Sequence, residues 1–394
     1  MFSLTRVLTQ EQAKTSICLT ATTHKAAAVL AKSHHKDVNT IHSVLGLKVT
    51  KDFRTGLTSL KPSGNKQAMP NLFMVVVDEA SMINWELLAY IRKGFSSDTK
   101  ILYIGDSYQL APVREPTSPV FTQVKRHAHL TEPVRQQEDS PIFKFGQMFR
   151  QLLIDGMHNK RWPSIEDLKA NQGEVIHVSH DDWWSMALPA IQQDPMNNKI
   201  LAWSNNRVQE CNSFVRKYLN KPVDLQANEW VVANKPIFTR NNAILARTDQ
   251  EVLIESIGNR VNWTTLGGHV LPYPGFELWL RQIQIKGFAV YIVESDQVSN
   301  YKLLQKYYKG TKDWPNFYLL EEQVADLRPS YASTVYKAQG STWDQVFIDL
   351  DDISRCTSWK EVARMMYVAV TRPRTRVVLA GNIKVMNWTD LNAA

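Results

Sequence analysis

Two adjacent carboxylates end a hydrophobic run early in the chain. The run 71–77 is continuously apolar apart from its first residue, and Asp78 and Glu79 follow it directly. Such a run predicts a strand buried on both faces of a parallel sheet, and these sheets bind ligands at the carboxyl edge of their strands. There Asp78 can hold Mg²⁺, and Glu79 can polarise the water that attacks a γ-phosphate. The pair alone is also typical of a strand that simply ends in a polar turn.

A second apolar run ends in a Gly-Asp pair. The run 101–104 precedes Gly105 and Asp106, and Gln109 stands three residues after the aspartate. A glutamine beside a phosphate can hydrogen-bond the γ-phosphoryl group or the attacking water without adding charge. Gln109 could therefore report the state of a nucleotide, although a lone glutamine in a loop would mean little.

Two arginines each close a short, partly apolar segment. Arg135 ends segment 130–135, and Arg372 ends segment 367–372. A planar guanidinium offers bidentate bonds to phosphate oxygens, and across a cleft it stabilises the charge that develops in phosphoryl transfer. Taken singly, either residue is also typical of a surface arginine.

Two helix starts near the N-terminus suit a phosphate backbone. Thr23 and His24 lie where the run 16–22 passes into an alanine-rich helix, and Thr40 and His42 open the next helix. Backbone amides and hydroxyls at a helix start can hold a phosphate. Ordinary N-capping by serine and threonine has the same appearance.

A later segment, 333–342, combines hydroxyls, an aromatic ring and a lysine. It contains Thr334, Tyr336 and Lys337. That mixture suits a nucleic-acid backbone with a base stacked on the ring.

The elements that must position these residues form two alternating sets. The first set has strands at 16–22, 71–77 and 100–104 and helices at 25–32 and 86–94. The second has strands at 174–178, 199–203, 345–350 and 376–379 and helices at 183–192, 207–219 and 359–370. Strands that alternate with helices indicate doubly wound parallel sheets. We therefore predict an α/β protein with two such domains.

Two insertions interrupt this alternation. Segment 47–60 alternates weakly around Gly56, which predicts a β-hairpin with its turn there. Segment 233–327 has short β-like runs separated by Gly, Asn and Pro, then a polar helix near 296–308. We predict a small β-barrel with a helical arm, inserted into the second domain.

Composition sets broad limits on the protein. The 394 residues suffice for two or three domains. The net charge of +8 fits either a well-solvated surface or a groove for a polyanion such as nucleic acid. Three widely spaced cysteines imply neither disulfides nor a zinc site. Without a membrane-length apolar stretch or a signal-peptide core in 1–14, we expect a cytoplasmic protein with no membrane partner.

Taken in order, these segments resemble the helicase motifs of superfamily 1, in the Dda/RecD-like branch. The matching patterns are Thr-x-His-Lys-Ala-Ala, Thr-Ile-His-Ser, Val-Asp-Glu-Ala-Ser-Met, Gly-Asp-x-x-Gln-Leu-x-Pro-Val, Ala-Trp-Ser-Asn-Asn, Tyr-Lys-Ala-Gln-Gly and Tyr-Val-Ala-Val-Thr-Arg. They run from Ser16 to Arg372, nearly the whole chain. Each pattern alone is weak to moderate, but seven in this order are not expected by chance.

The resemblance implies two RecA-like parallel-sheet domains, with ATP in the cleft between them and single-stranded DNA across their top. The implied divisions are a first domain at 1–171 with a strand-separating pin at about 47–70, a second domain at 172–232 and 328–394, and an inserted SH3-like barrel with a helical tower at 233–327.

The resemblance also implies a role for each residue singled out above. Asp78 would bind magnesium, Glu79 would be the general base, and Gln109 would sense the γ-phosphate. The arginine fingers would be Arg135 and Arg372, Gly340 would lie beside the nucleotide, and the DNA contacts would be Thr23, His24, Thr40, His42, Thr334, Tyr336 and Lys337, with Phe53 near the tip of the pin.

The implied function is an ATP- and Mg²⁺-dependent DNA helicase that moves 5′ to 3′. Its substrates would be single-stranded DNA and the duplex fork, in phage DNA replication or recombination. A single-stranded DNA-binding protein would be a further partner. RNA as a substrate stays open.

The chain departs from the family pattern at three places. Thr22 stands where a proline is usual, and Tyr336 stands where a histidine is usual, which leaves the DNA contact at Tyr336 open. No segment matches Gly-x-x-x-x-Gly-Lys-Ser/Thr, the loop that holds the β- and γ-phosphates. Segment 63–66 has a glycine before a lysine but lacks the second glycine. We therefore expect the first domain to be incomplete at its N-terminus.

Three accounts of this difference stay open. The sequence could begin too late within its gene, or a separate polypeptide could supply the phosphate-binding loop as a partner. Alternatively, the chain could be an ATPase-dead protein that binds single-stranded DNA or regulates another protein. The third account belongs to a different functional class from a helicase motor.

Overall fold

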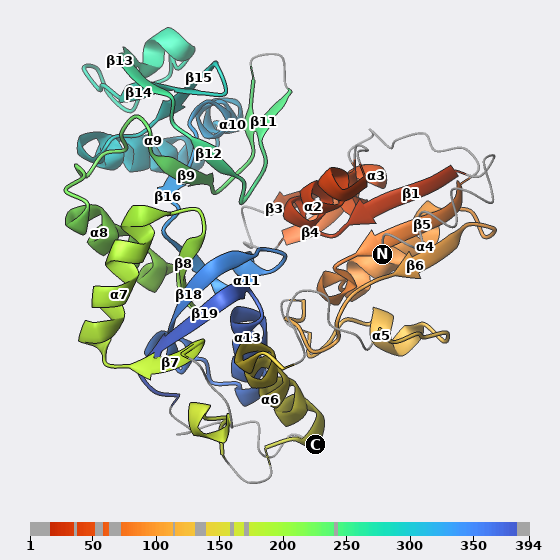
Figure 1. Ribbon diagram of the computed structural model, residues 1–394. Helices are drawn as coiled ribbons and strands as arrows, with labels where there is room; N and C mark the ends of the chain where they lie inside the picture. Colours follow the sequence, from red (N-terminus) through yellow and green to blue (C-terminus); the bar gives the residue numbers. More distant parts are fainter. Residues whose placement is uncertain are drawn as a thin grey trace.

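The computed structural model describes residues 16–34, 38–51, 58–62, 72–112, 115–130, 139–157, 161–168, 173–239 and 243–383. Within these residues, two parallel sheets occupy separate parts of Figure 1, and a group of shorter antiparallel strands lies beyond the second sheet. This confirms the predicted α/β class with two parallel-sheet domains.

The first sheet has four parallel strands. Their order is β2 (Asn39–Thr40), β1 (Ser16–Ala21), β5 (Leu72–Asp78) and β6 (Lys100–Tyr103). Its helical elements are α2 (His24–His34), α3 (Ile41–Val44), η1 (Ala80–Met82), α4 (Trp85–Gly94) and α5 (Val120–Gln123). Helix α4 begins where the Asn84 side chain accepts a hydrogen bond from the Leu87 amide. Its apolar face buries Leu88 and Ile91.

The second sheet has five parallel strands. Their order is β17 (Ala332–Thr334), β8 (Asn198–Ala202), β18 (Trp343–Asp349), β19 (Pro373–Ala380) and β7 (Val175–Val178). The associated helical elements are α6 (Pro141–Asp155), η2 (Ile165–Asp167), α7 (His180–Gln193), α8 (Asn205–Tyr218), α11 (Val335–Ala338), α12 (Leu350–Ile353) and α13 (Trp359–Val370).

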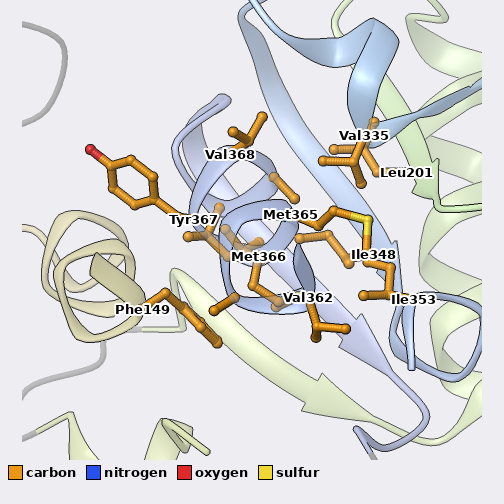
Figure 2. Packing of buried hydrophobic residues seen from close by; sticks show 14 of the residues in the cluster. Phe149, Leu201, Val335, Ile348, Ile353, Val362, Met365, Met366, Tyr367 and Val368 are labelled. Atoms are coloured by element: carbon orange, nitrogen blue, oxygen red, sulfur yellow. The ribbon is translucent and has the colours of Figure 1, made fainter. Parts of the chain in front are cut away.

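Helix α13 lies at the centre of the larger core. Figure 2 shows Val362, Met365 and Met366 of this helix packed close to Phe149 of α6 and Ile348 of β18. Helix α6 therefore packs with the second sheet, although it precedes residue 171, where we predicted the domain boundary. That boundary stays a prediction.

The inserted segment folds as short antiparallel strands and two helices. One sheet joins β12 (Glu251–Leu253), β9 (Trp230–Ala233) and β16 (Leu327–Pro329); another joins β13 (Ser256–Asn262), β14 (Trp279–Ile285) and β15 (Phe288–Ile292); and β10 (Ile237–Phe238) pairs with β11 (Ile244–Ala246). The helical elements are η3 (Trp263–Leu266), η4 (Ser295–Gln297), α9 (Val298–Gly310) and α10 (Trp314–Gln323). The SH3-like assignment of this insertion stays a prediction.

The predicted pin is described in part. Strands β3 (Leu47–Lys51) and β4 (Thr58–Pro62) form an antiparallel pair. The expected turn at Gly56 and the tip residue Phe53 lie outside the described residues. Among the described helices, every one is too short or too polar to span a bilayer.

Candidate functional site

The carboxylate pair lies at the carboxyl edge of the first sheet, as predicted. Asp78 is the last residue of β5, and Glu79 follows with a φ of 53°, in the left-handed region that non-glycine residues seldom adopt. The backbone here is fixed by the next strands: the Thr22 amide donates to the Asp78 carbonyl (3.2 Å), and the Ala80 amide donates to the Ile104 carbonyl (2.8 Å). The two carboxylates are therefore held side by side.

This pair has the electrostatics of a cation site. Burial, and then the negative charge of Glu79, raise the pKa of Asp78 to about 6. Carboxylate oxygens are the ligands that Mg²⁺ prefers, usually one or two of them together with waters and phosphates. No cluster of three or more His, Cys, Asp or Glu side chains suited to a metal occurs among the described residues. The two carboxylates therefore fit a magnesium ion that arrives with a nucleotide.

A glutamine from the second domain closes over this edge. The Nε2 of Gln339, at the end of α11, lies 3.2 Å from Glu79 Oε2, 3.1 Å from Ser81 Oγ and 3.1 Å from Gln109 Oε1. The structure thus brings Glu79 and Gln109 to one point, although they follow different strands. The Oε1 of Gln339 is buried without a hydrogen-bond partner among the described residues.

Gly340 lies at the same junction. Its φ of 76° is in the left-handed region, which glycine adopts without strain. A Cβ at this position would lie 3.9 Å from Glu79 Oε1. The predicted place of Gly340 beside a nucleotide therefore coincides with the general-base candidate.

Of the two predicted arginine fingers, Arg372 lies within the described residues. Arg135 lies outside the described residues. Arg372 is 3% exposed, and its guanidinium donates to the carbonyls of Val368 (2.9 Å) and Ser341 (3.3 Å) and to the Thr371 hydroxyl (3.0 Å). All three partners belong to the second domain. These bonds hold the guanidinium against its own domain, and its role as a finger stays a prediction.

The threonines predicted to contact DNA all serve as helix caps. Thr23 accepts a hydrogen bond from the Ala26 amide (3.2 Å), Thr40 from the Ser43 amide (3.2 Å) and Thr334 from the Lys337 amide (3.3 Å). Capping uses one lone pair of each hydroxyl oxygen and leaves its proton available. A phosphate contact at these residues remains a prediction.

The two histidines are close enough to influence each other electrostatically. Burial, and then the positive charge of Arg247 from the insertion, lower the pKa of His24. Burial, and then His24, lower the pKa of His42. The Nδ1 of His24 is buried without a hydrogen-bond partner among the described residues. Both rings are therefore neutral near pH 7 and can take part in hydrogen bonds without contributing charge.

The remaining predicted DNA residues contact protein groups. The Tyr336 hydroxyl donates to Glu361 of α13, and burial followed by the charge and hydrogen bond of Glu361 raises the pKa of this tyrosine. The Nζ of Lys337 lies 2.7 Å from Asp249 Oδ1 and donates to Asn234 Oδ1 (2.9 Å). Lys337 thereby ties the second sheet to the insertion, and a phosphate would have to compete with a carboxylate for it.

A cavity of about 1150 Å³ lies between the second sheet and the insertion, and Lys25 is among its lining residues. Several of its cations are already paired with carboxylates. Lys199 lies 2.8 Å from Glu251, and Lys235 lies 3.5 Å from Glu321. The lining does not include Glu79 or Gln109. The cavity is therefore separate from the carboxylate edge.

Comparison with known proteins identifies the family. The AAA domain family matches residues 1–151, and the UvrD-like helicase C-terminal domain family matches residues 329–380. The ATP-dependent DNA helicase Dda of Enterobacteria phage T4 is 26% identical over 408 residues, which cover 91% of this chain and 86% of that protein. The RecD subunit of the RecBCD enzyme of Buchnera aphidicola is 34% identical over 400 residues, covering 86% of this chain and 58% of that protein.

Over nearly its whole length the chain is similar to superfamily 1 DNA helicases, and both relatives place this similarity in the Dda/RecD-like branch. The solved structure of the Pif1 helicase from Candida albicans aligns over 98% of this chain and 90% of that one, with 15% identity and a TM-score of 0.46.

Gln339 and Arg364 contact the candidate site, and neither was predicted from the sequence. Gln339 stands beside Gly340 in a recognised pattern, and that position was the available signal. Arg364 lies one helical turn before Tyr367, outside the quoted patterns, and its partners come from the other domain. Sequence carried no sign of that contact.

Proposed function

We propose that this chain is the motor of an ATP-dependent DNA helicase that moves 5′ to 3′ on single-stranded DNA and opens duplex at a fork. The observation that carries the proposal is the contact of Gln339 with Glu79, Ser81 and Gln109. A group on one domain thereby meets the candidate base and the candidate sensor on the other. Family membership and the name of the phage T4 relative support ATP as the nucleotide and DNA as the substrate.

In this proposal Asp78 holds Mg²⁺ and Glu79 accepts a proton from the attacking water. When bound, the magnesium ion would supply positive charge against the negative charge that develops in phosphoryl transfer, and Asp78 would be its ligand from this chain. Gln109 bonds the γ-phosphoryl group. The Oε1 of Gln339, which has no hydrogen-bond partner among the described residues, can accept from the attacking water. Arg135 and Arg372 supply the remaining positive charge, and Gly340 lets the backbone approach the phosphates.

The proposed DNA path runs over both domains. Its contacts are Thr23, His24, Thr40, His42, Thr334, Tyr336 and Lys337, with Phe53 at the fork. The Nδ1 of His24, buried and without a hydrogen-bond partner in the part of the chain that the structure describes, supports a contact there. The match to a phage helicase supports a role in phage DNA replication or recombination.

A second candidate is a non-catalytic protein that binds single-stranded DNA on the same scaffold, or one half of a split helicase. The sequence lacks Gly-x-x-x-x-Gly-Lys-Ser/Thr, and this observation favours it. Carboxylates, glutamine and arginines act on charge at the γ-phosphate. They do not replace the amides and lysine that hold the β-phosphate.

Single-turnover ATP hydrolysis with single-stranded DNA distinguishes the two candidates. We expect the 394-residue chain to hydrolyse ATP poorly and the chain extended by a Gly-x-x-x-x-Gly-Lys-Thr segment to hydrolyse it briskly. In the extended protein, Glu79→Gln should lower turnover by about 10²–10⁴-fold, as expected for loss of a general base, and spare nucleotide binding. The matched control is Glu322→Gln, on the exposed face of α10.

Three results would decide against parts of this proposal. Absence of DNA-stimulated hydrolysis in both proteins would favour the non-catalytic candidate. Brisk hydrolysis by the 394-residue chain, lost on Glu79→Gln, would show that another segment holds the phosphates. Equal effects of Glu79→Gln and Glu322→Gln would remove Glu79 from the chemistry.

A further inference from the structure

The loop that carries Gln109 is anchored on the other domain. It follows β6 of the first sheet, yet Arg364 of α13 donates through Nη1 to the carbonyls of Ser107 (2.8 Å) and Gln109 (2.6 Å). The Tyr367 hydroxyl donates to Asp106 Oδ2 (2.8 Å). Two side chains of one helix therefore hold three residues of this loop.

The loop's apolar end is buried in the same place. Leu110 is 1% exposed and belongs to the core that surrounds α13. Burial of this leucine side chain stabilises the position of the loop against α13. Within the loop, the Tyr108 amide donates to Asp106 Oδ1 (2.9 Å), so Asp106 links the Tyr367 hydroxyl to the loop backbone.

The carboxylates opposite this loop are anchored differently. Asp78 and Glu79 are held by hydrogen bonds from Thr22 to their carbonyls, within the first sheet. A change in the angle between the domains would therefore move Gln109 with α13, while Glu79 stays with its own sheet. The distance between the sensor and the base candidate would follow the position of the second domain.

The same helix also holds a segment on the proposed DNA path. Glu361 of α13 accepts from the Tyr336 hydroxyl. Glu361, Arg364 and Tyr367 are spaced by three residues, so they lie on successive turns near one side of the helix. In Figure 2 the Tyr367 side chain points away from the buried cluster. Its hydroxyl contacts Asp106 of the loop.

We propose that Arg364 and Tyr367 are positioning residues that clamp the Gln109 loop to α13 and so link the DNA-tracking segment at Tyr336 to the nucleotide sensor. This proposal rests on the proposed function, because it requires single-stranded DNA to bind over the second domain. Neither residue touches substrate; each acts through the backbone or side chain of the loop. Burial lowers the pKa of Arg364, and the charge of Asp106 acts in the opposite direction.

Hydrogen–deuterium exchange of the loop amides tests the link without requiring ATP hydrolysis. The full chain is measured with and without an oligothymidylate, and fluorescence anisotropy measures its affinity for the same oligonucleotide. We expect DNA to slow exchange in segment 105–111 of the unaltered chain by at least about fivefold, the lower end of typical coupling between sites.

The variants are Tyr367→Phe, Arg364→Lys and Arg364→Gln. Tyr367→Phe removes one hydroxyl and keeps the ring, and Arg364→Lys keeps the charge but loses the planar fork. We expect each to bind the oligonucleotide within about threefold of the unaltered chain, a difference below about 1 kcal/mol. The response of segment 105–111 to DNA should be lost. The control is Arg374→Gln, which removes an exposed ion pair with Asp344 in the same domain.

The outcomes distinguish a clamp that couples DNA binding to the sensor loop from a contact that only stabilises the loop. A contact that only stabilises the loop predicts faster amide exchange of segment 105–111 in the variants, with an unchanged response to DNA. That result would overturn the proposal. Exchange that rises throughout α13 and β19 would show general loosening of the domain, and it would also count against a specific clamp. Failure of the unaltered chain to bind the oligonucleotide would contradict the proposed function itself, and the proposal with it.

Discussion

At the scale of single residues, Gln339 is the contact between the two halves of the site. Its Nε2 carries two protons and has three acceptors within 3.2 Å, on Glu79, Ser81 and Gln109. One of these acceptors is a carboxylate, and hydrogen bonds to charged groups contribute more than those between neutral groups. The amide therefore both screens Glu79 and holds the domains together.

Gln339→Ala should lower the free energy of unfolding by about 1–3 kcal/mol, because it leaves a partly buried carboxylate without its donor. Gln339→Glu should lower it further, since it places a second carboxylate within hydrogen-bond distance of Glu79. Urea unfolding at neutral pH measures both. Gln323→Ala, at the exposed end of α10, is the control. A glutamate variant no less stable than the alanine variant would mean that Glu79 is not near position 339.

What sequence could predict at this scale depends on where the partner lies. The carboxyl ends of parallel strands meet at one edge, so the apolar runs that precede Glu79 and Gln109 were enough to predict that both residues lie there. The contacts of Gln339 and Arg364 join different domains. They depend on how two separately folded sheets meet, and no local pattern encodes that geometry.

At the scale of elements, long apolar runs and helical periodicity predicted strands and helices correctly. The run 71–77 became β5, Leu72–Asp78, and segment 359–370 became α13 with the same bounds. Strand β17, Ala332–Thr334, was not predicted, because three residues of mixed polarity carry no period. Helix α6 was not predicted either, and its place against α13 follows from Phe145 and Phe149, which are buried by long-range packing.

The contact between α11 and the insertion leads to a prediction about DNA affinity. Lys337 and Asp249 are each about one-third exposed and lie 2.7 Å apart. Because a pair of this kind contributes about 0.2–1 kcal/mol, Asp249→Asn should remove the carboxylate that competes for Lys337 and strengthen binding of single-stranded DNA by about two- to fivefold. Asparagine also tolerates the φ of 61° at this position. Fluorescence anisotropy gives the measurement.

Asp344→Asn is the matched control for this change, since Asp344 pairs with Arg374 at an exposed site. Weaker DNA binding by Asp249→Asn than by the control would mean that the ion pair orders the insertion for DNA. In that case the ion pair with Asp249 would not compete with a phosphate for Lys337.

At the scale of the whole molecule, the net charge does not say which of the cations are free to meet DNA. The chain carries +8, but Lys199, Lys235 and Lys337 face carboxylates around the cavity beside the insertion. A lysine that is paired with a carboxylate displaces few counterions from DNA unless that ion pair breaks. The net charge and the family could be predicted from the sequence. Which lysines pair with carboxylates depends on how the domains fold and pack.

Binding of single-stranded DNA should weaken as salt rises, with log K falling by about 0.7 per phosphate neutralised for each decade of salt. An anisotropy titration between about 50 and 200 mM salt measures this slope. The slope should be the same at about pH 7.5 and about pH 6.5, near the ordinary pKa of histidine. Burial lowers the pKa of His24 and of His42, so both are less protonated at the lower pH than an ordinary histidine would be. A flat response would argue against a groove that follows the backbone, and a slope that steepens at the lower pH would show that these histidines charge on binding.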